Sequence, residues 1–109
     1  MSESRLNKLL SYYEKDGQDA FIIFALAKEY EQLSQNDKAL EHYLELKKKH
    51  SDYIGLYYHL AKLFEKLGDT TLAMDTYNEG VELAKSQKDF HALSELNNAR
   101  MNLEMEMDN

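Results

Sequence analysis

The chain has 109 residues, of which 43% are hydrophobic and 30% are charged; it contains no cysteine, and its formal net charge is −7. The lack of cysteine excludes disulfides, thiol catalysis and cysteine metal sites. The acidic balance argues against nucleic-acid binding, which needs clustered lysine and arginine, and it mildly favours a basic protein partner. Because proline is absent, glycine is scarce and helix-forming residues dominate, the composition predicts an all-α protein.

The first segment predicts a helix over residues 3–14, followed by a turn in which Gly17 ends the helix. Its apolar residues recur at helical spacing and are Leu6, Leu9, Leu10 and Tyr13. The polar start is unlike a secretory signal. The longest apolar run, residues 20–27, is too short to span a bilayer. We therefore expect a cytoplasmic protein without a membrane partner.

Two helix pairs are expected next, over residues 20–33 with 37–49, and over residues 53–67 with 71–85. The first helix of each pair carries apolar residues at i, i+3, i+4 and i+7, which form one helical face. The second helix of each pair places an alanine and a tyrosine at i and i+4. These core positions are Ile23, Leu26, Ala27, Tyr30, Ala39, Tyr43, Tyr57, Leu60, Ala61, Phe64, Ala73 and Tyr77.

The breaks within the two pairs, residues 34–37 and 68–71, are polar. Asn36 or Asp37, and Asp69 or Thr70, can accept hydrogen bonds from the free N–H groups that open the following helix. Gly68 suits the left-handed conformation that ends a helix.

A last helix is expected over residues 89–104, with Asp89 as its N-cap. Its apolar residues at helical spacing are Phe90, Leu93, Leu96, Ala99 and Leu103. Because this segment does not keep the pattern of the two pairs, we interpret it as a capping helix. The methionine-containing, acidic tail over residues 101–108 is interpreted as a frayed helix end.

The two pairs are copies of one unit, because matching residues recur after 34 positions. The units read Ile23-x2-Leu26-Ala27-x2-Tyr30 with Ala39-x3-Tyr43, and Tyr57-x2-Leu60-Ala61-x2-Phe64 with Ala73-x3-Tyr77. This pattern resembles the tetratricopeptide repeat family, whose 34-residue unit reads W-x2-L-G-x2-Y, then A-x3-F, then P. The chain departs from this pattern at three positions of the unit. Ile23 and Tyr57 stand where the family has tryptophan, Ala27 and Ala61 where it has glycine, and Ser51 and Lys85 where it has proline.

The resemblance implies a stack of antiparallel helix hairpins, an α-α superhelix with two full repeats, an N-terminal helix and a C-terminal capping helix. The expected domain spans residues 1–109, with the N-terminal helix at 3–14, repeat 1 at 20–52, repeat 2 at 53–86 and the capping helix at 89–105.

The resemblance also implies a non-enzymatic adaptor or scaffold that binds a peptide or helix in a concave groove. The groove would be lined by the first helices of both repeats. Candidate partner-binding residues are Phe24, Lys28, Glu31, Tyr58, Lys62, Glu65 and Lys66, with Phe21, Gln32 and Gly55 beside them. An alternative is a structural module that completes its short repeat array by pairing with a second copy.

Two interpretations compete for the extra aromatics. Phe21 and Phe24 either pack against the N-terminal helix at Leu6, Leu9 and Tyr13, or form an exposed strip that anchors a partner. Tyr58 is open to the same two interpretations.

Signatures of catalysis or of cofactor binding are absent from the sequence. His42 lies near Glu41 and Glu45, but no second histidine follows at i+3 or i+4, so we interpret this segment as a solvated helix face without metal. The basic run of residues 47–50 is interpreted as charge that offsets the carbonyl end of its helix. We expect no catalytic residue, no metal and no cofactor.

Overall fold

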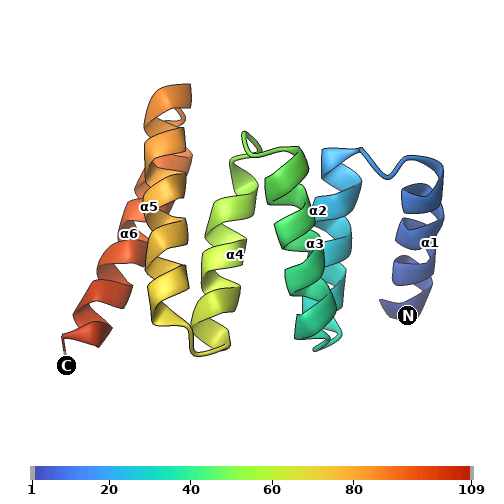
Figure 1. Cartoon of the computed structure of the whole chain (residues 1–109), viewed down its shortest axis with the longest axis horizontal. Helices are drawn as coiled ribbons and strands as arrows, with labels where there is room; N and C mark the ends of the chain where they lie inside the picture. The colour runs from blue at the N-terminus through green and yellow to red at the C-terminus, as the bar shows by residue number, and fades with distance from the viewer. Residues whose placement is uncertain (1, 109) are drawn as a thin grey trace. The chain divides into compact units, whose positions relative to one another are not determined.

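The computed structural model describes the backbone of residues 2–108 and the side chains of residues 4–108. Over this part of the chain the backbone forms α-helices and no strand, which confirms the all-α fold class. The helices are α1 Ser2–Lys15, α2 Ala20–Gln32, α3 Asn36–Lys49, α4 Gly55–Lys66, α5 Thr70–Gln87 and α6 Phe90–Met107 (Figure 1). Their ends lie within three residues of the expected ones. The outermost residues of the predicted 1–109 range, 1 and 109, lie outside the described part. None of the described helices has the length and apolarity needed to cross a bilayer.

Aspartate side chains open three of the helices. The Oδ1 atom of Asp19 accepts from the backbone N–H of Ile22 at 3.1 Å, at the start of α2. Asp69 accepts in the same way from the N–H of Leu72 at the start of α5, and Asp89 from that of Ala92 at the start of α6, each at 3.0 Å. The predicted caps Asp69 and Asp89 are therefore confirmed. The cap predicted for α3, Asn36 or Asp37, is wrong. The helix already begins at Asn36, and Gln35, the residue before it, makes no side-chain capping bond.

The hairpin turns of the two repeats share one left-handed residue. Gly68 has φ +83°, as predicted, and Ser34, which lies 34 positions earlier, has φ +60°. In both turns the next residue donates its N–H back to a carbonyl of the preceding helix, from Gln35 to Tyr30 and from Asp69 to Phe64, each at 2.9 Å. This is the hydrogen-bond pattern of a Schellman motif. The repeat therefore extends to the turn backbone, although only one copy uses glycine.

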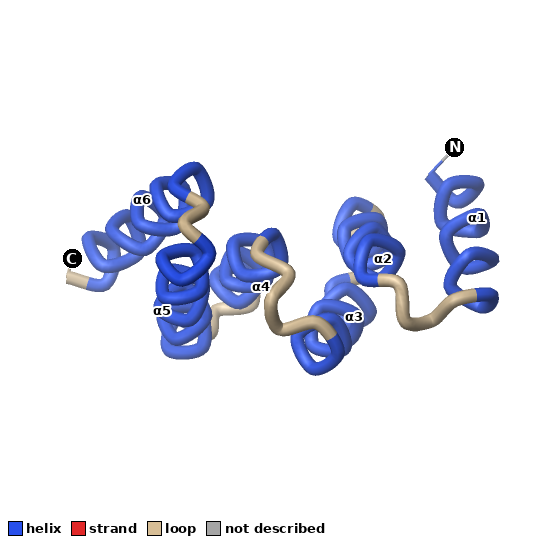
Figure 2. Tube along the Cα trace, turned by 90° about the horizontal axis from the view of Figure 1, so that it is seen from above, coloured by secondary structure: helices blue, strands red, loops and turns tan. Residues whose placement is uncertain are grey.

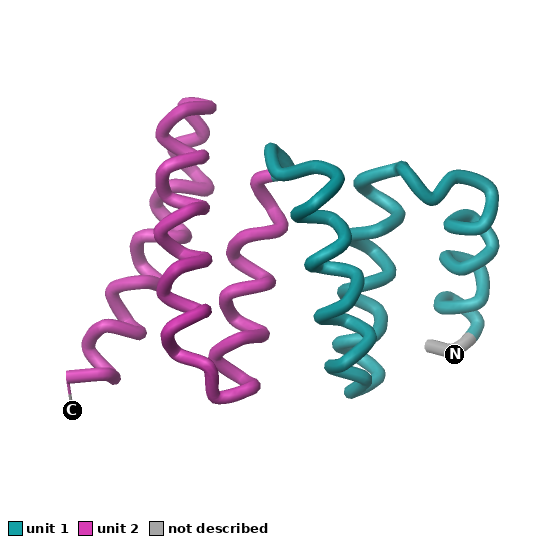
Figure 3. Tube along the Cα trace, in the orientation of Figure 1, with its two compact units in different colours: residues 1–53 teal, residues 54–109 magenta. Residues whose placement is uncertain are grey.

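The chain divides into two compact units, with the division between Tyr53 and Ile54 (Figure 3). In unit 1, α2 and α3 lie antiparallel and side by side, and α1 packs against α2 (Figure 2). The small, fully buried side chains of Ala27 and Ala39 leave room for close helix approach, and the fully buried Tyr43 ring adds bulk. The other buried apolar residues of this unit are Leu9, Ile23, Ala25, Leu26, Tyr30 and Leu46.

In unit 2, α4 and α5 form the same kind of hairpin, and α6 packs against α5 and also contacts α4. Gly80 on α5 marks the tightest approach: a Cβ atom there would lie 2.7 Å from the Cβ of Tyr57 and 3.1 Å from both methyls of Leu96. The three helices of the unit therefore meet at a position without a side chain. The apolar core of this unit is Leu56, Tyr57, Leu60, Ala61, Leu63, Phe64, Ala73, Tyr77, Val81, Ala84, Leu96, Ala99 and Leu103. All twelve core positions named from the repeat pattern lie buried in their units.

Candidate functional site

A pocket of about 410 Å³ lies beside α2 in unit 1. The lining residues on α2 are spaced by three or four positions, which places them on one side of the helix. Four of its lining residues, Phe21, Phe24, Lys28 and Gln32, were expected to line a groove, whereas Arg5 of α1 was not. The full lining is Arg5, Phe21, Phe24, Ala25, Lys28, Glu29 and Gln32.

The two phenylalanines of the pocket differ in environment. Phe21 is 67% exposed, so the interpretation in which it packs against the N-terminal helix is wrong. The ion pair between the two helices lies further along α2, where Arg5 of α1 pairs with the buried Glu29, and it leaves the Phe21 ring exposed. Phe24 is half-buried: its ring centroid lies 5.3 Å from that of Tyr53, within unit 1, and the residue also lines the pocket. Phe24 thus has a structural contact and a pocket-lining role together.

Glu29 lines the pocket but was not among the residues predicted from the sequence. Its side chain is only 3% exposed, and its Oε1 atom lies 3.1 Å from the Nε of Arg5. Its Oε2 atom is buried and has no hydrogen-bond partner among the described residues. A signal was available, because the position 34 residues later is Leu63, which is fully buried in unit 2. A carboxylate at a core position of the repeat is expected to have a specific role or partner.

Lys28 and Arg5 place positive charge at the pocket. The Nζ atom of Lys28 lies 5.7 Å from the ring centroid of Phe24, within the range of a cation–π contact. The Lys28 side chain is exposed, and that of Arg5 is 68% exposed. Since Glu29 carries the only carboxylate among the lining residues, the formal charge of the pocket lining is +1, in a chain of net charge −7.

The candidate residues Glu31 and Glu65 have a function inside their units. The Tyr43 hydroxyl donates to Glu31 at 2.6 Å, and the Tyr77 hydroxyl donates to Glu65 at 2.5 Å. The two pairs are related by the 34-residue shift. Burial, followed by these hydrogen bonds to carboxylates, raises the pKa of both tyrosines well above its usual value. Each bond ties the second helix of a hairpin to the first.

The other candidates lie on α4 of unit 2. Tyr58 is half-buried and meets the His59 ring edge-on, with centroids 5.4 Å apart. Lys62 is about half-exposed, and its Nζ lies 4.0 Å from Glu65 Oε2. Lys66 is exposed. Tyr58, Lys62 and Lys66 thus offer an aromatic edge and two cations on the first helix of repeat 2.

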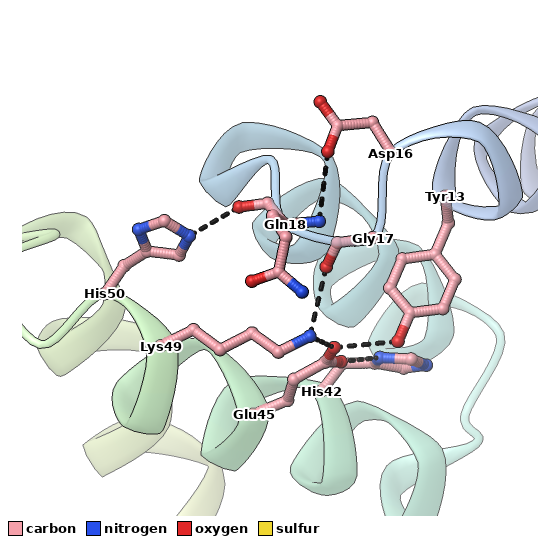
Figure 4. Close-up of polar contacts among 8 residues, drawn as sticks. All are labelled: Tyr13, Asp16, Gly17, Gln18, His42, Glu45, Lys49 and His50. Atoms are coloured by element: carbon pink, nitrogen blue, oxygen red, sulfur yellow. Dashed lines mark hydrogen bonds and ion pairs between the residues drawn. The ribbon is translucent and has the colours of Figure 1, made fainter.

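Glu45 of α3 is the centre of a polar cluster that joins α3 to the segment before α2 (Figure 4). Its carboxylate accepts from the Tyr13 hydroxyl at 2.7 Å and from Lys49 Nζ at 2.7 Å, and it lies 2.9 Å from His42 Nδ1. Burial alone would raise the pKa of Glu45, but these hydrogen bonds outweigh it and lower the pKa. The bond to Glu45, with a smaller effect of burial, raises the pKa of Tyr13 to about 12.

The cluster corrects two interpretations made from the sequence. His42 does not lie on a solvated face, because its ring stacks on Tyr30 with an interplanar angle of 1° and is only 13% exposed. Lys49 and His50 do more than offset the end of their helix: their side chains bond the backbone carbonyls of Gly17 and Gln18 at 3.1 and 2.5 Å. Within the described residues, no three histidine or acidic side chains are grouped to hold a metal ion.

Known proteins resemble this chain in sequence and in fold. A family model described as tetratricopeptide repeat matches residues 54–87, which include α4 and α5. A tetratricopeptide repeat domain protein from Salinibacter ruber is 41% identical, with 79% of this chain and 96% of that chain covered and a TM-score of 0.76. No curated protein matches the chain.

Two further solved structures are similar at low identity and show the fold alone. The type III secretion translocator chaperone SycD from Yersinia enterocolitica is 14% identical, with 99% of this chain and 75% of that chain covered and a TM-score of 0.90. PcrH, solved in complex with the chaperone binding region of PopD, is 16% identical, with 97% and 80% covered and a TM-score of 0.88. The repeat pattern, the family model and the Salinibacter ruber relative together show that this chain belongs to the tetratricopeptide repeat family.

Proposed function

We propose that this chain is a non-enzymatic protein-interaction module that binds a peptide or helix of another protein through the first helices of its repeats, α2 and α4. One observation carries the proposal: the 67% exposed ring of Phe21 stands with Phe24 in a pocket that the fold does not fill. Exposed apolar surface bordered by charged groups marks interaction sites. The PcrH structure, which contains a bound region of PopD, supports the same use of this fold.

On α2, the phenylalanines would supply the apolar contact and Lys28 the polar one. Covering an exposed phenylalanine ring contributes roughly 1.5–3 kcal/mol to association. Lys28 can meet a carboxylate of the partner while its stem covers part of the pocket wall. On α4, Tyr58 and Lys62 would act in the same way, as an aromatic contact with a cation four residues later.

The proposal is tested by capturing partners from an extract of the cells that produce the protein. Two surface variants are compared with the native chain: Phe21→Ala with Lys28→Glu, and Tyr58→Ala with Lys62→Glu. The matched control, Leu72→Ala with Lys85→Glu, removes an exposed apolar residue and reverses an exposed lysine on α5.

Circular dichroism first establishes that all variants are folded. The control should retain the partners of the native chain, and at least one surface variant should lose them. Folded surface variants that both retain the same partners at the same yield would remove α2 and α4 from the binding account.

A second candidate function, pairing with another copy of the chain, is favoured by one observation on α6. Four large apolar side chains on this helix are more than half exposed: Phe90, Met101, Met105 and Met107. Light scattering over a wide concentration range distinguishes the two functions, because a constant monomer mass would eliminate self-association and leave the binding of a different protein.

A further inference from the structure

The Oε2 atom of Glu29 is buried and has no hydrogen-bond partner among the described residues. Glu29 is also one of the residues that line the pocket. An unsatisfied buried acceptor is costly, and native proteins seldom retain one without a role. The matching position of the other repeat holds Leu63, so the hairpin itself does not require a carboxylate here. The atom is therefore a suitable acceptor for a donor from outside the chain.

The pocket restricts what kind of donor fits. A ligand cation would meet Arg5 and Lys28, which already place two positive charges around the single carboxylate of the lining. A ligand anion would have to approach that buried carboxylate. A neutral donor avoids both penalties. Because Phe21 and Phe24 form the apolar wall, the body of the ligand should be apolar, and an aromatic ring suits two phenylalanine rings best.

The chain itself uses one neutral aromatic donor against buried or half-buried glutamates. The hydroxyls of Tyr13, Tyr43 and Tyr77 donate to glutamates at 2.7, 2.6 and 2.5 Å. The rings of Tyr43 and Tyr77 are fully buried and that of Tyr13 is half-buried, and in each case the hydroxyl satisfies the carboxylate. Glu29 offers the same acceptor beside the same kind of apolar wall, but no tyrosine of the described chain reaches it.

We propose that the pocket takes a tyrosine side chain of the partner, with its ring against Phe21 and Phe24 and its hydroxyl donating to Glu29 Oε2. This inference rests on the proposed function, whose partner chemistry it specifies. The pocket volume, about 410 Å³, is within the range of roughly 300–1,000 Å³ that is typical of specific ligand sites. Glu29 lines this pocket, and the Arg5 and Phe21 side chains that line it with Glu29 are both about two-thirds exposed, so they have room to turn as the ring enters.

The test uses the full ¹⁵N-labelled chain and two soluble neutral probes, N-acetyl-tyrosinamide and N-acetyl-phenylalaninamide. They differ only in the hydroxyl group. NMR titration should show that the tyrosine probe shifts the amides of α2 around Phe24 and Lys28. It should bind about tenfold more tightly than the phenylalanine probe, as expected for one hydrogen bond to a charged acceptor. N-acetyl-lysinamide serves as the cationic probe and should not shift these amides.

The key variant is Glu29→Leu, which copies the residue of the other repeat and so keeps the hairpin packed. It should bind both probes equally. Phe90→Ala, which removes an exposed ring of unit 2, should retain the tenfold preference.

Three results would overturn the inference. The native chain could bind the two probes equally, or the preference for the tyrosine probe could persist in Glu29→Leu. The third result is that the pocket amides do not shift up to the solubility limit of the probes. None of these results touches the proposed function, which is decided by the capture experiment with the surface variants.

Discussion

Replacing Gly80 by alanine tests the closest helix approach in the structure. The added Cβ would lie 2.7 Å from the Cβ of Tyr57 and 3.1 Å from both methyls of Leu96. Since favourable carbon–carbon contacts begin at about 3.5 Å, α4 and α5 must separate by about 0.8 Å at this point. The Tyr57 Cβ is attached to the backbone of α4 and cannot move aside by changing rotamer, so the strain falls on the helix packing.

The expected size of the effect follows from two opposing contributions. Overpacking of a filled core costs typically 1–3 kcal/mol, and a clash with backbone-attached atoms belongs at the upper end of that range. Alanine also favours the helix over glycine by about 1 kcal/mol. We therefore expect Gly80→Ala to lower the free energy of unfolding by about 2 kcal/mol, and the melting temperature by about 8–16 °C for a chain of this size.

Urea denaturation followed by circular dichroism measures this change. The control Thr71→Ala lies on the same helix at an exposed position, and it should leave stability unchanged or slightly higher. A Gly80→Ala chain that is as stable as the native one, or more stable, would refute the close approach of α4 and α5 at Tyr57.

Three further predictions follow from the repeat. Ser34→Gly should raise the free energy of unfolding by about 1 kcal/mol because φ is +60° there, and Gly68→Ala should lower it by a similar amount, both measured by urea denaturation. Ala27→Leu should cost about 1–3 kcal/mol by overpacking, and an unchanged melting temperature would contradict its placement between packed helices. Tyr43→Phe and Tyr77→Phe should each cost about 1–2 kcal/mol near neutral pH, because a half-buried carboxylate loses its donor. The pKa of both tyrosines is raised in the folded state, so their contribution is complete below the unfolded value of about 10 and is lost as pH rises above it. The difference between the native chain and these variants should therefore shrink above that pH, and a difference that stays constant would contradict the hydrogen bonds.

The repeated packing could be predicted from the sequence because it depends on residues that recur at a fixed spacing. Tyr43 and Tyr77 have no exposed surface, as the pattern of alternating small and large residues requires. Gly68 adopts the left-handed conformation for which only glycine has no steric cost. In the first repeat the same backbone conformation falls on Ser34, and composition alone could not reveal it.

The candidate site was harder to predict because it depends on α1, which does not follow the repeat. The sequence places Phe21 near several apolar residues of α1, but it does not state which face of α2 the helix covers. In the structure Arg5 of α1 reaches the Glu29 carboxylate, 24 positions away, and Phe21 stays exposed. The Glu45 cluster was missed for the same reason, since its bonds reach Tyr13 and the turn before α2.

Site-specific photo-crosslinking tests the central claim, that this module contacts its partner at the α2 pocket. A photoreactive phenylalanine analogue is placed at the position of Phe21, and in a separate chain at that of Phe90, which is similarly exposed on α6. After irradiation of the living cells, we predict a crosslinked partner from the Phe21 position and none from the Phe90 position. A partner that is crosslinked only from the Phe90 position would contradict the account.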